Sequence, residues 1–188
     1  DPDTFTFGEF MQRKQGDYDN AVNPYEPFKN LTNNDAKLFV NTYLGWERWT
    51  NDIGETEYAV YIRDVQVDDG IIVSKDGVEK VKKLLADYSG LNDAAKNELN
   101  AVVLYQDREK RNVTFLDWMG DCNAVYTNTV NPYEPFKDLK DADAIRFVEN
   151  YIDYGRWNDN YWAQLKDVRM EDGELRGDID TLANAVNA

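Results

Sequence analysis

The chain has no histidine, one cysteine and no long apolar run, and each absence excludes a class of function. Without histidine there is no imidazole to act as a general base, to complete a Ser-His-Asp triad or to bind a catalytic zinc ion. No glycine-rich phosphate loop and no Cys-x-x-Cys pair occurs. Cys122 cannot form an intramolecular disulfide, and no segment approaches the roughly 20 apolar residues of a membrane span. We therefore expect no enzyme, no catalytic residue, no cofactor and no membrane association.

Basic residues are also scarce. The 188 residues include 36 acids and 21 bases, which gives a net charge of -15. The excess is uneven, because residues 1–70 carry -8, residues 71–110 are neutral and residues 111–188 carry -7. A solvated surface explains acidity in many proteins, but acidity confined to two segments also indicates two charged binding surfaces.

The strongest positive signal is an internal duplication. The octapeptide Val22–Lys29 returns unchanged as Val130–Lys137. A shift of 108 residues aligns Phe7–Trp49 with Phe115–Trp157 without a gap, and 20 of these 43 positions are identical. The sequence therefore predicts a first repeat over residues 1–73, a connector over 74–110 and a second repeat over 111–188. A repeated unit builds a repeated surface, which favours binding over catalysis.

The predicted fold class is α+β, with two tandem copies of a small helix–loop–helix–β-hairpin unit joined by a helical connector. Thr6 and Thr114 begin the first helix of each copy, and a loop with two prolines follows it. The expected helices and strands then lie at 34–44 and 141–152 (helices), 58–67 and 161–170 (strands), 71–73 (a short strand), and 77–88, 93–110 and 178–186 (helices).

Carboxylates alone leave two chemical possibilities. A paired-acid mechanism is compatible with the composition, although nothing in the sequence places two carboxylates across a cleft. Acids also recur after the predicted strand of each repeat, where Asp-Gly favours a turn and oxygen ligands could hold a hard cation. The recurrent acids are Asp64, Asp68 and Asp69 in the first repeat and Asp167, Glu171 and Asp172 in the second. We favour the turn and expect no metal.

The tryptophans allow a second kind of surface. Trp46, Trp49, Trp157 and Trp162 could stack on sugar rings, although packing in the core is the simpler interpretation. The neighbouring Arg48 and Arg156 are expected to make internal ion pairs or stacking contacts.

We interpret the two acidic segments as a DNA mimic. Duplex DNA carries one negative charge per roughly 1.7 Å of its axis, so carboxylates on a rigid body can occupy a basic DNA-binding groove. The expected partner is a DNA-handling protein, such as a restriction-modification enzyme, a CRISPR effector or a repressor, with no direct nucleic-acid binding. The predicted contact residues are the acids shared by both repeats, Glu9, Glu26, Asp35, Asp68, Asp69, Asp117, Glu134, Asp143, Glu171 and Asp172.

Two segments resemble a known family. Glu57–Asp64, and the stretch Leu91–Ala101 that follows a predicted helix, are similar to the middle of ArdA-type antirestriction proteins. The resemblance covers about a quarter of the chain. It implies an acidic inhibitor that occupies the DNA-binding site of type I restriction enzymes, in the cytoplasm of a bacterial host.

Two other functions remain open. The chain could be a secreted or surface module that binds carbohydrate or protein through its aromatic residues. It could also be a structural repeat protein of a larger assembly, and a homodimer is possible.

Overall fold

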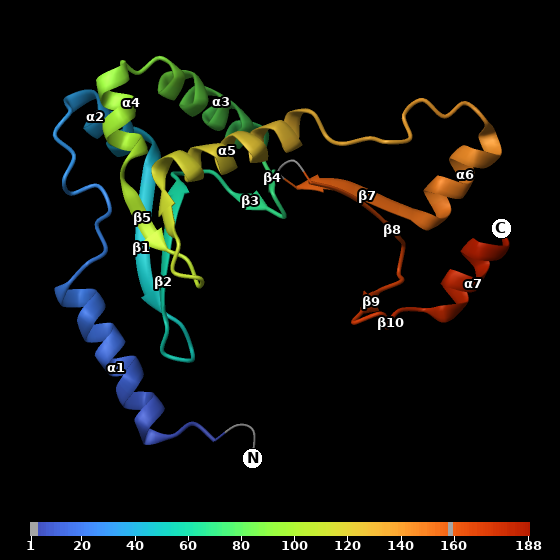
Figure 1. Cartoon of the computed structure of the whole chain (residues 1–188), viewed down its shortest axis with the longest axis horizontal. Coiled ribbons are helices and arrows are strands. Elements are labelled where there is room, and N and C mark those ends of the chain that lie inside the picture. The colour runs from blue at the N-terminus through green and yellow to red at the C-terminus, as the bar shows by residue number, and fades with distance from the viewer. Residues whose placement is uncertain (1–3, 158–159) are drawn as a thin grey trace. The chain divides into compact units, whose positions relative to one another are not determined.

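The computed structural model describes residues 4–157 and 160–188 and shows an α+β protein, as the sequence predicts (Figure 1). The chain forms two compact units. The first contains the chain up to Val67 together with Ile72–Asn123, and the second contains Asp68–Ile71 and the chain from Ala124 onward. These units differ from the predicted segments 1–73, 74–110 and 111–188, because the connector and the start of the second repeat pack onto the first repeat.

The first unit begins with helix α1 (Phe7–Val22), the proline loop (residues 23–28) and helix α2 (Asn34–Tyr43). Strands β1 (Leu44–Thr50) and β2 (Thr56–Ile62) form an antiparallel hairpin. The short β3 (Val67–Asp68) and β4 (Ile71–Ile72) form another, whose residues Asp68–Ile71 are assigned to the second unit. The connector supplies α3 (Lys75–Ser89), α4 (Asp93–Asn100), β5 (Val103–Gln106) and β6 (Asn112–Thr114), which leads into α5 (Phe115–Val130).

Side-chain caps explain where several helices begin. Thr6 and Glu9 form a complete capping box at α1, since each side chain accepts a hydrogen bond from the backbone N–H of the other. The side chains of Asn33, Ser74 and Asn92 accept hydrogen bonds from first-turn N–H groups of α2, α3 and α4. The prediction that Thr6 begins the first helix is confirmed.

Two strand regions were wrongly predicted. The helices expected over 34–44 and 141–152 end at Tyr43 and Tyr151, and the chain continues into the unpredicted strands β1 and β7, because their backbones pair with β2 and β8. The helix expected over 93–110 ends at Asn100, and β5 follows. The β-branched residues Val102 and Val103 favour a strand there, and the Asp107 carboxylate accepts the N–H groups of Glu109 and Arg111 to close the β5–β6 turn.

The core of the first unit lies where α2, α3, α4 and the first turns of α5 meet the β1–β2 and β5–β6 hairpins. In Figure 1, α2, α3 and α4 gather at one end of these hairpins, and α1 lies apart from them at the other end. The core residues are Phe28, Leu31, Ala36, Phe39, Val40, Leu44, Leu84, Ala95, Leu99, Leu104, Phe115 and Met119. The first repeat is thus closed by residues from the connector and from the second repeat.

The second unit contains the second half of α5, the proline loop of residues 131–136 and helix α6 (Ala142–Tyr151). Strands β7 (Ile152–Trp157) and β8 (Asn160–Leu165) pair antiparallel, as do β9 (Met170–Glu171) and β10 (Glu174–Leu175), and α7 (Ile179–Asn187) follows. The element order repeats that of the first unit up to α3. Helix α6, however, has no buried residue, whereas α2 buries three.

Candidate functional site

The first pair of predicted contact acids, Glu9 and Asp117, occupies helix N-termini. The Glu9 carboxylate accepts the Thr6 N–H at 2.6 Å and the Thr6 hydroxyl at 2.8 Å. Asp117 accepts the N–H and the hydroxyl of Thr114, both at 2.9 Å. The backbone hydrogen bond, and then the hydroxyl, lower the pKa of each carboxyl. Both acids are exposed, held in place and ionised at neutral pH.

The second pair, Asp35 and Asp143, lies in the first turns of α2 and α6 and is exposed. Asp35 accepts a hydrogen bond from the Asn92 side-chain amide at 3.0 Å. Asp143 lies 3.4 Å from the Arg146 guanidinium, which is itself largely exposed. Surface ion pairs of this kind are weak, so both carboxylates are available to a cationic partner.

The third pair, Glu26 and Glu134, has a structural role in the proline loops. Each carboxylate accepts the N–H of the phenylalanine two residues later, Phe28 or Phe136, at 3.1 Å. Glu134 also accepts the Tyr154 hydroxyl, and this hydrogen bond raises the pKa of Tyr154. Glu26 is only partly exposed. These two acids fix the loops and are the weakest candidates for contact with a partner.

The acids at the two short hairpins lie at the surface. Asp68, Asp69, Glu171 and Asp172 are all exposed. Asp69 and Asp172 have positive φ values of 46° and 50°, a conformation that aspartate tolerates better than most residues and that reverses the chain within two residues. The turns place two neighbouring carboxylates at the tip of each hairpin.

The two hairpins differ in their nearby bases. The Glu171 carboxylate lies 3.4 Å from Arg169 and 3.9 Å from Arg176. No ion pair to Asp68 or Asp69 occurs in the described part of the chain. Within residues 4–157 and 160–188, no group of three or more Cys, Asp or Glu side chains is placed to hold a metal ion.

The repeated arginines bind neutral oxygens rather than carboxylates. Arg48 Nε donates to Asn20 Oδ1 at 2.6 Å, and Arg156 Nε donates to Asn128 Oδ1 at 2.7 Å. Each guanidinium also donates to a backbone carbonyl at or just beyond the C-terminal turn of α1 or α5, where the helix dipole is negative. Among the described residues neither arginine forms an ion pair or stacks on a ring, so the predicted contacts are not found there and these two bases leave the described acidic side chains unneutralised. Asn20 and Asn128 are identical in the alignment of the two repeats. This match could have predicted the asparagine as the partner of each arginine.

The tryptophans divide between packing and exposure. Trp46 packs edge-on against Phe28, with ring centroids 5.3 Å apart, and is partly buried. Trp157 and Trp162 are each 45% exposed, and Tyr161 between them in the β7–β8 hairpin is 59% exposed. Of the four predicted tryptophans, Trp46 packs against the core, and Trp49 is 39% exposed.

Glu98 has a role that sequence reasoning missed. Its carboxylate accepts the N–H groups of Thr32 and Asn33 and the Thr32 hydroxyl, which joins α4 to the start of α2. The backbone hydrogen bond from Thr32, with smaller help from its hydroxyl and from Asn33, lowers the pKa of Glu98. No local pattern indicates a contact across 66 residues.

Cys122 does not have the surroundings of a nucleophile. It is 7% exposed in the first unit, and burial, followed by the charge of Asp121, raises the pKa of its thiol. The thiolate is therefore scarce at neutral pH.

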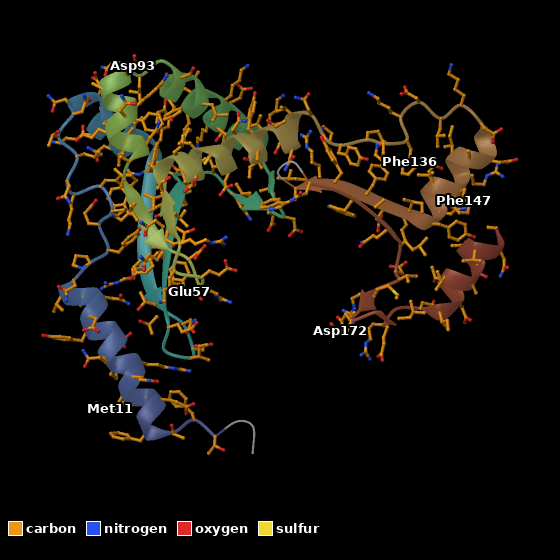
Figure 2. All side chains as sticks on the ribbon, in the orientation of Figure 1. Met11, Glu57, Asp93, Phe136, Phe147 and Asp172 are labelled. Atoms are coloured by element: carbon orange, nitrogen blue, oxygen red, sulfur yellow. The ribbon has the colours of Figure 1, made fainter. Side chains whose placement is uncertain are left out.

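An open groove of about 870 Å³ lies in the first unit between β2 and the β5–β6 turn. The Tyr58 and Tyr105 rings stack beside it, 6.4 Å apart at 15°. Its charged lining is mixed, and Arg108 lies 4.0 Å from Glu57, which is labelled in Figure 2. The groove has neither a uniform charge nor an activated nucleophile.

The ten predicted acids thus lie at helix starts, proline loops and hairpin tips. The acids that lie beside each other are those adjacent in sequence, Asp68 with Asp69 and Glu171 with Asp172. No protein-family model, no curated protein and no solved structure matches this chain. The resemblance to ArdA-type proteins remains a prediction. No helix in residues 4–157 and 160–188 is both long and apolar enough to cross a membrane.

Proposed function

We propose that this protein is a non-enzymatic, acidic binding protein that mimics DNA and occupies the basic DNA-binding groove of a nucleic-acid-handling protein. The observation that carries the proposal is the paired carboxylates exposed at the hairpin tips of both repeats, Asp68 with Asp69 and Glu171 with Asp172. Equivalent acids at equivalent turns provide negative charge at repeated positions, as a phosphate backbone does.

The disposition of the bases supports the same function. Arg48 and Arg156 donate to amide and carbonyl oxygens, so these two bases neutralise no carboxylate among the described residues. Ion pairs occur both in the connector, where Lys80 and Lys83 pair with acids one helical turn away, and in the repeats, where Arg146 pairs with Asp143. The charge excess of the repeats comes from their surplus of acids, as the sequence distribution indicates.

The target follows from this charge and from the resemblance stated above. A restriction-modification enzyme, a CRISPR effector or a repressor presents a basic groove that such a surface fits, and these targets place the protein in a bacterial cytoplasm. The interaction should lose affinity steeply with salt, because both charged surfaces release their counterions on binding.

The test compares two variants of equal charge change. The first, Asp68→Asn, Asp69→Asn, Glu171→Gln and Asp172→Asn, neutralises the hairpin tips, and asparagine tolerates the positive φ at 69 and 172. The control, Asp76→Asn, Glu79→Gln, Asp93→Asn and Glu109→Gln, neutralises four connector acids. Each immobilised protein is used to retain DNA-binding proteins from a bacterial lysate, and bound protein is eluted with salt or with duplex DNA.

We expect the wild type to retain a DNA-handling protein that duplex DNA displaces. This partner should elute from the hairpin variant at a lower salt concentration than from the wild type or the control. Equal elution from both variants, or the absence of any partner displaced by DNA, would refute it.

One observation favours a second function. The exposed Trp157 and Trp162 lie on the same face of the β7–β8 hairpin, which suits a carbohydrate or protein ligand of a surface module. Quenching of tryptophan fluorescence by soluble glycans, lost in Trp162→Ala, would favour this function over DNA mimicry.

A further inference from the structure

We propose that copies of this chain associate head to tail, with the start of α1 of one copy covering the open face of the second unit of another. The α1 stripe consists of Phe7, Phe10 and Met11, and the open face consists of Phe136, Leu139 and Phe147. This inference is independent of the proposed function.

The first unit shows how such a contact is built, because α5 is the counterpart of α1 in the second repeat. Its first turns close the core of the first repeat. Phe115 is fully buried there, with its ring centroid 6.0 Å from that of Phe28 and 6.2 Å from that of Phe39, both nearly perpendicular. Met119 is 4% exposed, and the Trp118 indole N–H donates to the Val60 carbonyl at 3.1 Å. The first turns of this helix therefore bind the face formed by the preceding repeat.

The corresponding side chains of α1 are exposed to solvent. Phe7, Phe10 and Met11 stand 108 residues before Phe115, Trp118 and Met119, and they are 76%, 42% and 48% exposed. Figure 2 labels Met11 on α1, the helix that lies apart from the other helices of its unit. The second half of α1 is anchored through Asn20 and Arg48, and in the first half Arg13 donates a hydrogen bond to the Asp52 carbonyl at 3.3 Å while the apolar stripe stays exposed. The helix thus presents an apolar stripe with the register of α5.

The face that would receive this stripe is also open. In the first unit Phe28, Leu31 and Phe39 are 6%, 7% and 4% exposed. Their counterparts in the second unit are Phe136, which is partly exposed, and Leu139 and Phe147, which are 37% and 36% exposed. Figure 2 labels Phe136 and Phe147 on the proline loop and α6.

The local structure of this face is already that of the first unit. The Phe147 and Tyr151 ring centroids are 5.1 Å apart at 51°, as Phe39 and Tyr43 are 5.0 Å apart at 51°. Phe136 packs on Tyr154 at 5.4 Å and 64°, as Phe28 packs on Trp46 at 5.3 Å and 64°. The face therefore needs no rearrangement to receive the helix that its counterpart binds.

Charge also favours α1 as the occupant. The stretch Phe115–Cys122 carries Asp117 and Asp121, whereas Phe7–Lys14 carries one acid, Glu9, and two bases, Arg13 and Lys14. The stretch Phe7–Lys14 thus carries one net positive charge, and its bases form only exposed, weak ion pairs with Asp52 and Asp17, whereas the repeat that it would contact is strongly acidic. Lys14 replaces the buried Cys122, so its apolar stem must lie along the contact while its amine reaches solvent.

The contact should be weaker than the intramolecular one. In the described part of the second unit, α7 stands in the place of α3, and there is no counterpart of α4 or of the β5–β6 hairpin that help to close the first core. We expect a dissociation constant on the order of micromolar to millimolar. A contact between two different surfaces can repeat without closing, so chains or rings are expected rather than one symmetric dimer.

Sedimentation velocity over a range of concentrations tests the proposal with the full chain. Wild type should shift to larger species as concentration rises. The shift should persist at raised salt, because the contact is chiefly apolar and the repulsion between copies with a net charge of -15 is screened. DNA mimicry should instead lose affinity steeply with salt, so the two proposals can fail separately.

Three variants make the test specific. Phe7→Ala with Met11→Ala removes the stripe, Phe147→Ala removes part of the open face, and Tyr18→Ala changes an exposed residue on the anchored half of α1. The first two should remain monomeric alone, and the third should behave as wild type. Circular dichroism checks that each variant is folded.

Mixing the stripe variant with the open-face variant should restore dimers, because each supplies the surface that the other lacks. Wild type that stays monomeric in both salt conditions, association that survives loss of the stripe, or folded variants that fail to complement each other would each overturn the proposal.

Discussion

The two repeats have nearly the same local geometry and very different burial. Phe39 and Phe147 make equivalent contacts with the tyrosine one turn later, yet Phe39 is 4% exposed and Phe147 is 36% exposed. The difference arises from what covers them, because the first repeat is packed against the connector and the start of α5. One repeat therefore encodes its own helices and hairpins but not a closed core, and burial of its apolar face depends on its neighbours.

This comparison predicts that the two halves of the first helix of each repeat make different contacts. Its second half anchors its own repeat through the asparagine–arginine pair, Asn20 with Arg48 or Asn128 with Arg156. Its first half belongs to the preceding face. The following variants test this division.

The largest expected effect comes from Phe115→Ala. Removing a fully buried aromatic ring should destabilise the first unit by about 3–5 kcal/mol, because the lost packing leaves a cavity among Phe28, Phe39 and Tyr88. The matched Phe7→Ala removes an exposed ring and should change stability by less than about 0.5 kcal/mol. Urea unfolding at low protein concentration measures both. Equal losses would contradict the division of the helix into two halves.

A smaller contrast is expected at the second helix. Phe39→Ala should cost about 3 kcal/mol, since the ring contacts Tyr43, Tyr88 and Phe115. Phe147→Ala should cost about 1 kcal/mol, since its side chain is already partly hydrated. Amide hydrogen exchange, resolved separately for α2 and α6, reports the two effects. Similar protection of α2 and α6 in wild type would contradict the difference in burial.

Sequence reasoning found what local chemistry determines. Caps such as Thr6 and Thr114 and apolar spacing placed most helices within a few residues of their observed ends, and Asp-Gly located the short hairpins. Strand β1 was not predicted, because the chain passes from Tyr43 of α2 directly into the strand at Leu44 and no turn residue stands between them. The pairing of Leu44 with Ile62 is set by tertiary structure.

The predicted acids followed the same rule. Exposure of Asp68 and Asp172 could be expected from their turns, whereas the loop-fixing hydrogen bonds of Glu26 and Glu134 appear only in the fold. Alignment of the repeats found matching acids but did not indicate which of them the proline loops use. Exposed acids at matched turns, rather than matched acids alone, are the better criterion for a contact surface.

The smallest expected effect is a change in the pH dependence of stability in Glu98→Gln. This variant tests a contact of the first unit, because Glu98 joins the connector to the start of α2. Hydrogen bonding lowers the pKa of Glu98 in the folded state. Its stabilising contribution is therefore present above the unfolded pKa, about 4.3, and is lost as pH falls through the lower folded value. In the variant the amide NH2 group would face the N–H of Thr32 or Asn33. The variant should be less stable than wild type at pH 7, and the difference should shrink below about pH 4.

Glu79→Gln, the same charge change at an exposed site on α3, is the control and should show no such convergence. Thermal unfolding across pH gives the comparison, and a Glu98→Gln deficit that stays constant down to about pH 3 would show that the lowered pKa does not arise from this contact.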